Sequence, residues 1–174
     1  MFKELNNLRP FFEKPNMQYS VREIARKLDI TPATASKKLK EFAKKEILKY
    51  EKSRAYDLYQ ANVDNVAFRD IKVYYSITKI RQSKLLEELN KFYIKPTIIL
   101  FGSIAVGYDT EESDIDLVVI SENEKEFPEH KDFERKLKRK IQLFIVRNLK
   151  DLKNEHLINN VLGGIVLQGE IIWI

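Results

Sequence analysis

Two aspartates, Asp114 and Asp116, stand one residue apart at the start of an apolar run that is typical of a buried strand. Side chains at alternate strand positions point to the same face, so the two carboxylates converge on one spot. A pair of hard oxygen ligands on a rigid element favours Mg²⁺, which keeps its other coordination positions for water and phosphate. An isolated Asp-x-Asp pair is often a solvated strand end, so further signals are needed to predict a site.

Gly102 and Ser103 supply such a signal, because they directly follow a second apolar run at residues 97–101. The missing Cβ of a glycine lets the backbone approach a ligand, and a serine hydroxyl can bond a phosphate oxygen. If residues 104–107 open a helix, its free N–H groups add an anion site. The two patterns together predict phosphate and divalent-metal chemistry.

The stretch 102–120 resembles the signature of the DNA polymerase beta-like nucleotidyltransferase superfamily, in particular its minimal archaeal and bacterial members. The resemblance covers roughly residues 95–174. It implies that Gly102 and Ser103 hold a nucleoside triphosphate. It also implies that Asp114 and Asp116 bind the catalytic Mg²⁺ or Mn²⁺ ions.

The same family uses a third carboxylate on a later strand, for which the alternating apolar segment 140–146 is the candidate. The position that should face the metals is Gln142, and an amide cannot accept a proton. A positioned general base contributes about 10²–10⁴-fold to a rate, so this departure bears on catalysis more than on binding. The loop carboxylates that could substitute are Asp109, Glu111 and Glu112.

Composition limits the class of protein. A chain of 174 residues fits one ordinary domain or two small ones, and its 33% charged and 44% hydrophobic residues are typical of a soluble globular protein. No apolar stretch is long enough to span a membrane and no signal peptide is recognisable, so we expect no membrane partner. The absence of cysteine excludes disulfides and thiolate metal sites, and predicts a cytoplasmic protein.

Charge is unevenly distributed along the chain. Residues 1–95 carry 21 Lys and Arg against 12 Asp and Glu, whereas residues 96–174 carry 10 against 14. A basic front half joined to a mildly acidic back half indicates two domains, the first of which meets a polyanion. A generic basic surface would give the same numbers, so the choice between a polyanion-binding domain and such a surface depends on the residue pattern within the basic half.

That half contains the signals of two helices joined by a tight turn. Ser20 and Glu23 form a capping box for the first helix, and Thr31 with Pro32 caps and begins the second. The second helix, residues 33–45, turns Ala35, Leu39 and Phe42 inwards. Its outer face carries Thr34, Ser36, Lys37, Lys38 and Lys40.

A predicted two-stranded hairpin follows at residues 47–60, with a basic tip at Arg54. Residues 19–61 resemble a winged helix-turn-helix of prokaryotic transcription regulators, a module that also serves in protein interactions. The resemblance would place Ala33, Thr34 and Lys37 near the base edges of double-stranded DNA. It would place on phosphates the residues Thr31, Ser36, Lys38, Lys40 and Arg54.

We therefore predict an α+β protein with three parts. Residues 1–62 form a winged helix-turn-helix, residues 63–94 a helical linker that could pair two copies as a homodimer, and residues 95–174 a nucleotidyltransferase-fold mixed sheet flanked by helices. The last part should contain a helix over 148–162 and a terminal hairpin or edge strand after 164.

Two functions remain open. In the first, which we prefer, the protein is a Mg²⁺-dependent nucleotidyltransferase that binds DNA and moves a nucleoside monophosphate to an acceptor. In the second, it is a transcription regulator whose nucleotidyltransferase fold only senses nucleotide. The intact pair Asp114 and Asp116 favours the enzyme, while Gln142 and the hairpin favour the regulator.

Overall fold

The computed structural model describes residues 2–53 and 56–171, and it is a mixture of helices and sheets. The chain divides into two compact units, Met1–Tyr75 and Ser76–Ile174, called below the N-terminal and C-terminal units. Across the described ranges, no helix is long and apolar enough to cross a membrane.

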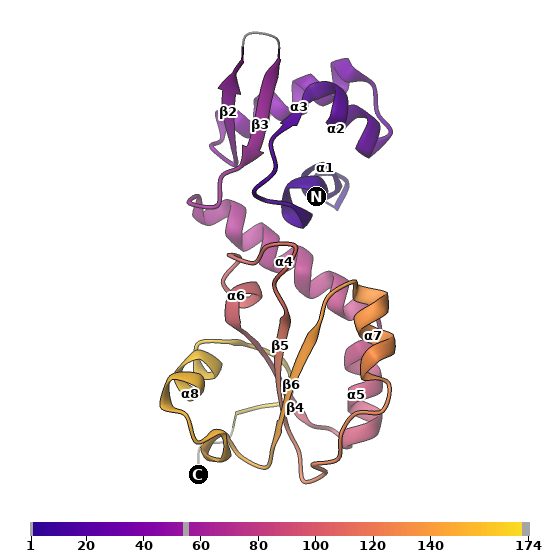
Figure 1. Ribbon diagram of the computed structural model, residues 1–174, viewed down its shortest axis with the longest axis vertical. Coiled ribbons are helices and arrows are strands. Elements are labelled where there is room, and N and C mark those ends of the chain that lie inside the picture. Colours follow the sequence, from indigo (N-terminus) through magenta and orange to yellow (C-terminus); the bar gives the residue numbers. More distant parts are fainter. Residues whose placement is uncertain (1, 54–55, 172–174) are drawn as a thin grey trace. The chain divides into compact units, whose positions relative to one another are not determined.

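The N-terminal unit combines helices with a small antiparallel sheet in which the strand order is β1-β3-β2 (Figure 1). Its elements are α1 (Phe2–Glu13), β1 (Tyr19–Ser20), α2 (Val21–Leu28), α3 (Pro32–Lys44), β2 (Leu48–Lys52), β3 (Asp57–Ala61) and the first part of α4 (Val66–Gln82). Strands β2 and β3 form the predicted hairpin, with Leu48 opposite Ala61 and Lys52 opposite Asp57. Arg54, predicted at its tip, lies outside the described residues.

Both predicted helix starts are confirmed. The Ser20 hydroxyl accepts from the Glu23 backbone N–H, and the Glu23 carboxylate accepts from the Ser20 backbone N–H at 2.8 Å, which completes a capping box for α2. Thr31 accepts from the Thr34 N–H at 3.2 Å, and Pro32 opens α3. Asp29, at a φ of 52°, ends α2 in the left-handed region and turns the chain towards α3.

Helix α1 was not predicted, although it supplies much of the core of this unit. Phe11 and Phe12 are almost fully buried, and the Phe12 ring lies 5.4 Å from the ring of Phe68 on α4. The spacing of Leu8, Phe11 and Phe12 at i, i+3 and i+4 was the available signal. Pro10 inside the helix masked that signal, because proline usually marks a helix end.

The C-terminal unit is built on a four-stranded mixed sheet with the order β6-β5-β4-β7. Strand β4 pairs antiparallel with β5 and β7, while β5 and β6 are parallel. Besides the end of α4, the elements are α5 (Leu85–Tyr93), β4 (Thr97–Phe101), α6 (Gly102–Ala105), β5 (Ile115–Ile120), α7 (His130–Leu137), β6 (Ile141–Val146), the 3-10 helix η1 (Leu149–Leu152), α8 (Glu155–Leu162) and β7 (Ile165–Gln168).

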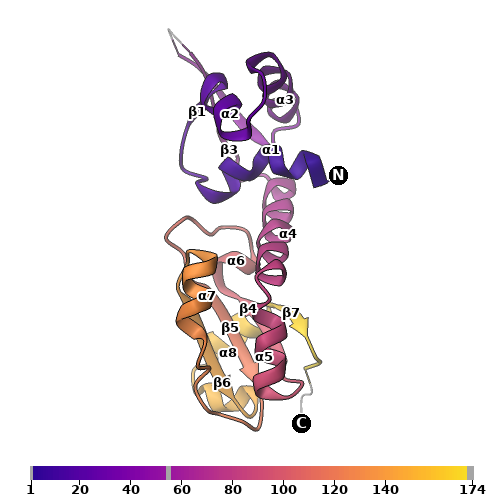
Figure 2. The ribbon, with the colours of Figure 1, turned by 90° about the vertical axis from the view of Figure 1, so that its right-hand side faces the viewer.

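Helices cover both faces of this sheet. Helices α5 and α7 lie on one face, and α8 lies on the other (Figure 2). Alternation along β5 sends Leu117 and Val119 into the core under α5 and α7, whereas Val118 belongs to the core under α8 and η1. Asp116 has the parity of Val118, so it faces the side of α8.

The segment 63–94, predicted as a linker, is helical but contributes to the cores of both units. Phe68 is buried in the N-terminal unit, whereas Leu85 and Leu89 are buried in the C-terminal unit. Two helices are present because Lys84 adopts a φ of 70° between α4 and α5. The buried Ser83 hydroxyl accepts from the Leu85 N–H at 3.1 Å and donates to the Ile80 carbonyl at 2.7 Å, which stabilises the break.

Two details of the tail differ from expectation. The single helix predicted over 148–162 is interrupted at Lys153, whose φ of 54° separates η1 from α8. Two alternatives were open for the segment after 164, a terminal hairpin and an edge strand, and β7 is an edge strand paired with β4. Residues 172–174, which the hairpin alternative required, lie outside the described residues.

Candidate functional site

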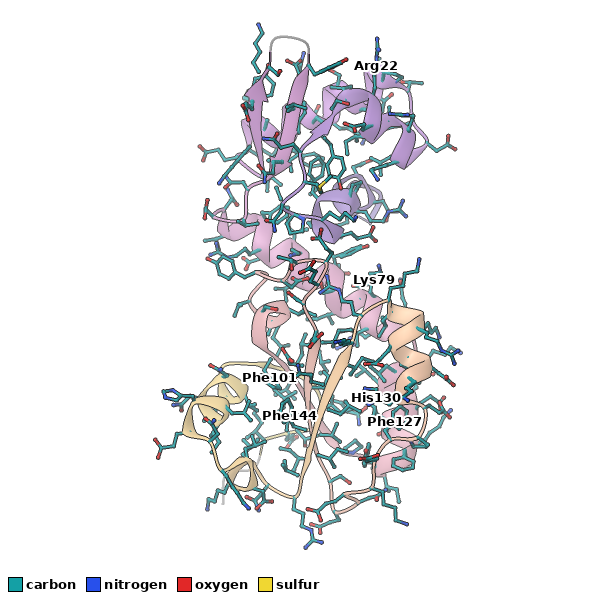
Figure 3. All side chains as sticks on the ribbon, in the orientation of Figure 1. Arg22, Lys79, Phe101, Phe127, His130 and Phe144 are labelled. Carbon is teal, nitrogen blue, oxygen red and sulfur yellow. The ribbon has the colours of Figure 1, made fainter. Side chains whose placement is uncertain are left out.

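The register of three strands brings the predicted site residues of the C-terminal unit together. Asp116 on β5 lies opposite Phe101, the last residue of β4, and opposite Gln142 on β6. Gly102 and Ser103 follow Phe101 directly, so the Gly-Ser pair and the second aspartate meet at the same end of the sheet. The rings of Phe101 and Phe144, both labelled in Figure 3, lie 5.6 Å apart on the same face.

Gln142 points towards the aspartates. Its amide nitrogen donates a hydrogen bond of 2.7 Å to Asp114 Oδ2, and Asp114 stands immediately before β5. The position predicted for a third carboxylate is therefore adjacent to the first two, but it presents an N–H donor to one of them. The amide orients the Asp114 carboxylate and adds no negative charge.

Gly102 is needed because Asp116 occupies the space where its side chain would be. A Cβ at Gly102 would lie 2.2 Å from Asp116 Oδ2, and the glycine backbone has a φ of +72°. Any other residue here would be strained by the backbone conformation, and its Cβ would force the Asp116 carboxylate to shift. We had expected the missing Cβ to admit a ligand, and the structure shows that it first admits the carboxylate.

The electrostatic environment of Asp116 is unfavourable for two neighbouring negative charges. Burial raises the pKa of the Asp116 carboxyl above its ordinary value, and the charge of Asp114 raises the pKa further. Bound cations remove such repulsion, which is one reason why paired carboxylates bind them.

The helix considered at residues 104–107 is present as a single turn, α6, which begins earlier, at Gly102, and ends at Ala105. Ser103 is half-buried, and its carbonyl accepts from the Tyr108 N–H at 3.0 Å, which folds the chain back after the turn. One turn is too short to provide a strong helix dipole. A phosphate at this point would therefore depend on the Ser103 hydroxyl and on local backbone N–H groups.

Asp109 does not act as a replacement for the third carboxylate. Its side chain is only 1% exposed and forms an ion pair of 2.9 Å with Arg139. Arg139 also donates to the carbonyl of Ser113, the residue before Asp114, at 3.1 Å. The other two loop candidates, Glu111 and Glu112, are exposed in the turn between these anchors.

The donor set fits a hard divalent cation, although with fewer charges than the family pattern implies. Asp114 and Asp116 supply carboxylate oxygens, and the space kept open at Gly102 accommodates the carboxylate of Asp116. Within the described ranges, no group of three or more His, Cys, Asp or Glu residues is arranged to hold a metal. The residues that would hold Mg²⁺ are therefore these two aspartates, with water and substrate oxygens completing its coordination.

The residues predicted to meet DNA lie on the N-terminal unit. On α3 and its cap, the exposed ones are Thr31, Ala33, Thr34, Lys37 and Lys40, while Ser36 and Lys38 are half-buried. Ala35 and Leu39 are buried on the opposite side of the same helix, as predicted. The structure thus presents these side chains on one helix face, and their role in binding stays a prediction.

Sequence reasoning missed two arginines near this face. Arg22 and Arg26 on α2 line a hollow of about 620 Å³ at the α2–α3 turn, with Asp29 and Pro32 on its other wall. Figure 3 shows Arg22 projecting outwards from its helix. The signal was present, because Arg22 and Arg26 stand four residues apart and therefore share one face of their helix.

Comparison with known families is informative for one unit. No curated protein matches the chain. Residues 82–163 match the model of the family described as nucleotidyltransferase domain, a range that begins just before α5 and ends after α8. Residues 82–163, in the C-terminal half of the chain, are thus similar to a nucleotidyltransferase domain, and this similarity supports a role in nucleotidyl transfer.

Proposed function

We propose that this protein binds double-stranded DNA through its N-terminal unit and, through its C-terminal unit, transfers a nucleoside monophosphate from Mg²⁺–NTP to an acceptor. The observation that carries the enzymatic part is the convergence of Asp114 and Asp116 beside Gly102, where a Cβ would lie 2.2 Å from the Asp116 carboxylate. The family match at residues 82–163 supports the same conclusion.

In such a reaction an acceptor oxygen attacks the α-phosphorus of the triphosphate, the bond to the β-phosphate breaks, and pyrophosphate leaves. Catalysis by a protein here is mostly positioning and charge stabilisation. Asp114 and Asp116 would hold the divalent ion, which supplies positive charge against the phosphates. Gln142 orients Asp114, and Ser103 offers its hydroxyl to a phosphate oxygen.

The DNA-binding part rests on the arrangement of the N-terminal unit. Two capped helices joined at Asp29–Ile30 are followed by the β2–β3 hairpin, which is the order of elements in a winged helix-turn-helix. Lys37 and Lys40 lie exposed on the second helix, and the hollow lined by Arg22 and Arg26 lies at the turn. These cations are suited to phosphate contacts.

One observation favours a second function, a nucleotide-sensing regulator. Gln142, whose amide donates a hydrogen bond of 2.7 Å to Asp114, occupies the position that should hold a negative charge in an active transferase. A protein with glutamine at this position would still bind Mg²⁺–NTP and report the presence of the nucleotide to the DNA-binding unit.

Labelled nucleotides distinguish the two functions. The full-length protein is incubated with Mg²⁺ and each α-labelled NTP, and the label is sought on protein, RNA, DNA and small acceptors. The test variant is Asp114→Asn with Asp116→Asn. The matched control is Glu111→Gln with Glu112→Gln, which removes two charges from the exposed part of the neighbouring loop.

We expect calorimetry to show Mg²⁺-dependent NTP binding in the wild type and in the control, and none in the aspartate variant. Transfer of label by the wild type identifies the enzyme. Binding without transfer identifies the sensor. Unchanged NTP binding in the aspartate variant would mean that the nucleotide site is elsewhere.

A further inference from the structure

Neither Gln142 nor Asp109 is placed to take a proton from an acceptor. Gln142 is an amide and donates to Asp114, and Asp109 is buried in its ion pair with Arg139. Asp114 and Asp116 are the ligands expected for the metal. Gln142 and Asp109 therefore supply no general base to this site, while Glu111 and Glu112 are exposed in the turn that precedes the aspartates.

That lack matters only for some acceptors. A hydroxyl group must lose its proton before or during attack, and the pKa of an unactivated hydroxyl is close to the value of about 15.7 for water. A general base contributes about 10²–10⁴-fold to such a step. A phosphate monoester has its second pKa near about 6, and a carboxylate near about 4, so their oxygens are already ionised at neutral pH.

Lys140 stands one residue before β6, at the end of the sheet that carries the aspartates. Its carbonyl accepts from the Ile115 N–H at 2.9 Å, which extends the β5–β6 ladder one step beyond Ile141. Alternation along this extended strand places Lys140 on the face of Gln142, next to Asp114. The side chain is exposed, and it forms no ion pair with any residue that the structure describes.

We propose that the acceptor of this transferase is an anionic oxygen, that of a phosphate monoester or a carboxylate, and that Lys140 helps to bind it. The inference rests on the transferase function proposed above. The ionised oxygen donates an electron pair to the α-phosphorus, a new P–O bond forms, and the bond to the leaving pyrophosphate breaks. No proton is released, so no base is required.

Three small acceptors of matched size test the inference: glycerol, glycerol 3-phosphate and glycerate. All three carry hydroxyl groups, and only the last two carry an ionised oxygen. We expect transfer to the phosphate of glycerol 3-phosphate or to the carboxylate of glycerate. A phosphoanhydride product is recognised by the coupled phosphorus resonances of its P–O–P linkage, and a mixed anhydride by trapping with hydroxylamine. A phosphodiester shows no such coupling and does not react with hydroxylamine.

Two variants separate the roles of the residues. Gln142→Asp restores a carboxylate and should raise transfer to the hydroxyl of glycerol, by up to about 10²–10⁴-fold. Lys140→Gln should raise the KM for the anionic acceptor by about tenfold, while calorimetry shows an unchanged Kd for Mg²⁺–NTP. Lys138→Gln is the matched control, because Lys138 is also exposed but belongs to the turn after α7.

The outcomes distinguish this inference from the function on which it rests. Transfer by the wild type to the hydroxyls of glycerol as readily as to the anionic oxygens overturns the inference and leaves the transferase intact. A Lys140→Gln variant that binds the acceptor as well as the wild type removes Lys140 from the proposal. Nucleotide binding without transfer to any of the three acceptors overturns the inference, and the transferase itself is overturned only if no label appears on protein, RNA or DNA either.

Discussion

The two units present their candidate functional residues in opposite ways. In the N-terminal unit, Lys37 and Lys40 are exposed on one helix, and neither depends on the other for its position. In the C-terminal unit, pairing of β5 with β6 brings Gln142 next to Asp114 and Asp116. The Asp116 carboxylate lies so close to Gly102 that there is no room for a Cβ between them.

This difference predicts two kinds of sensitivity. A surface of independent cations loses affinity in small, additive steps when residues are removed. A site assembled by strand register and close contact fails when one atom is misplaced, since an error of about 1 Å can cost about a hundredfold. The experiments below test that contrast, beginning with the largest expected effect.

Arg139→Gln should have the largest effect on stability. It leaves the Asp109 carboxylate, only 1% exposed, without its guanidinium partner, and breaking a buried ion pair in this way costs about 3–5 kcal/mol. Urea denaturation of the C-terminal unit within the full chain measures the loss. Asp109→Asn in the same chain should restore part of it, because the buried carboxylate charge that the guanidinium offsets is gone. If the single change were neutral, the loop that carries Asp114 would not depend on this pair.

Gly102→Ala should weaken the affinity for Mg²⁺–NTP by about a hundredfold or more, because the new methyl group displaces the Asp116 carboxylate. The backbone strain at a φ of +72° adds about 1–3 kcal/mol of instability. Gly163→Ala is the matched control. A Cβ there would be no closer than 3.6 Å to another atom, so we expect unchanged nucleotide binding. Full binding by Gly102→Ala would contradict the site.

Replacing Lys37, Lys38 and Lys40 together by Ala should weaken DNA binding without affecting NTP binding. Each phosphate contact contributes about 0.9 to the slope of log affinity against log salt, so the slope should fall by roughly two to three units. Because Lys38 is half-buried, Lys37 and Lys40 should each account for more of the change than Lys38.

The control for that experiment removes three lysines from the C-terminal unit, Lys91, Lys125 and Lys131, so that the change in net charge is the same. An identical loss of slope in the control would show that only total charge matters. Binding that does not depend on salt would remove DNA from the proposed function.

The smallest effect is expected at the start of α2. The pKa of Glu23 lies below its ordinary value of 4.5 because the Ser20 backbone N–H and hydroxyl donate to the carboxylate. A lowered pKa in the folded state contributes stability above pH 4.5, and this stability is lost as the pH falls through the folded pKa.

Glu23→Gln should therefore destabilise the N-terminal unit at neutral pH by no more than the roughly 1 kcal/mol typical of a lost cap. The difference from wild type should shrink below pH 4.5, as followed by thermal denaturation. Thr31→Ala removes a cap that contains no carboxylate, so its cost should not vary with pH. A pH-independent effect of Glu23→Gln would contradict this account of the capping box.

Local patterns in the sequence predicted much of this fold. The caps at Ser20 and Thr31, the β2–β3 hairpin and strand β4 follow from residue types within a few positions of one another. The position of Gln142 beside Asp114 also followed from alternation, because one misplaced residue in the register would have turned the amide to the other face.

Features that depend on distant residues could not be predicted. The packing of Asp116 against Gly102, where a Cβ would lie 2.2 Å from Oδ2, arises from pairing between β4 and β5. The ion pair of the buried Asp109 is made with Arg139, which lies thirty positions further along the chain. No local pattern distinguishes a loop aspartate that is paired in this way from one that is solvated. The contribution of residues 63–94 to both cores has the same origin, since helical periodicity does not say which core receives each residue.

The parallel pairing of β5 with β6 also has a kinetic consequence. Strand β4 can meet β5 after closing only the chain from 102 to 114, whereas β6 can meet β5 only after residues 121–140 have crossed over. Longer closures cost more entropy, and parallel pairs form slowly. During refolding, Asp116 should therefore meet Gly102 before Gln142 reaches Asp114, so an early intermediate should already carry the two carboxylates beside Gly102 while its edge at β5 is still open.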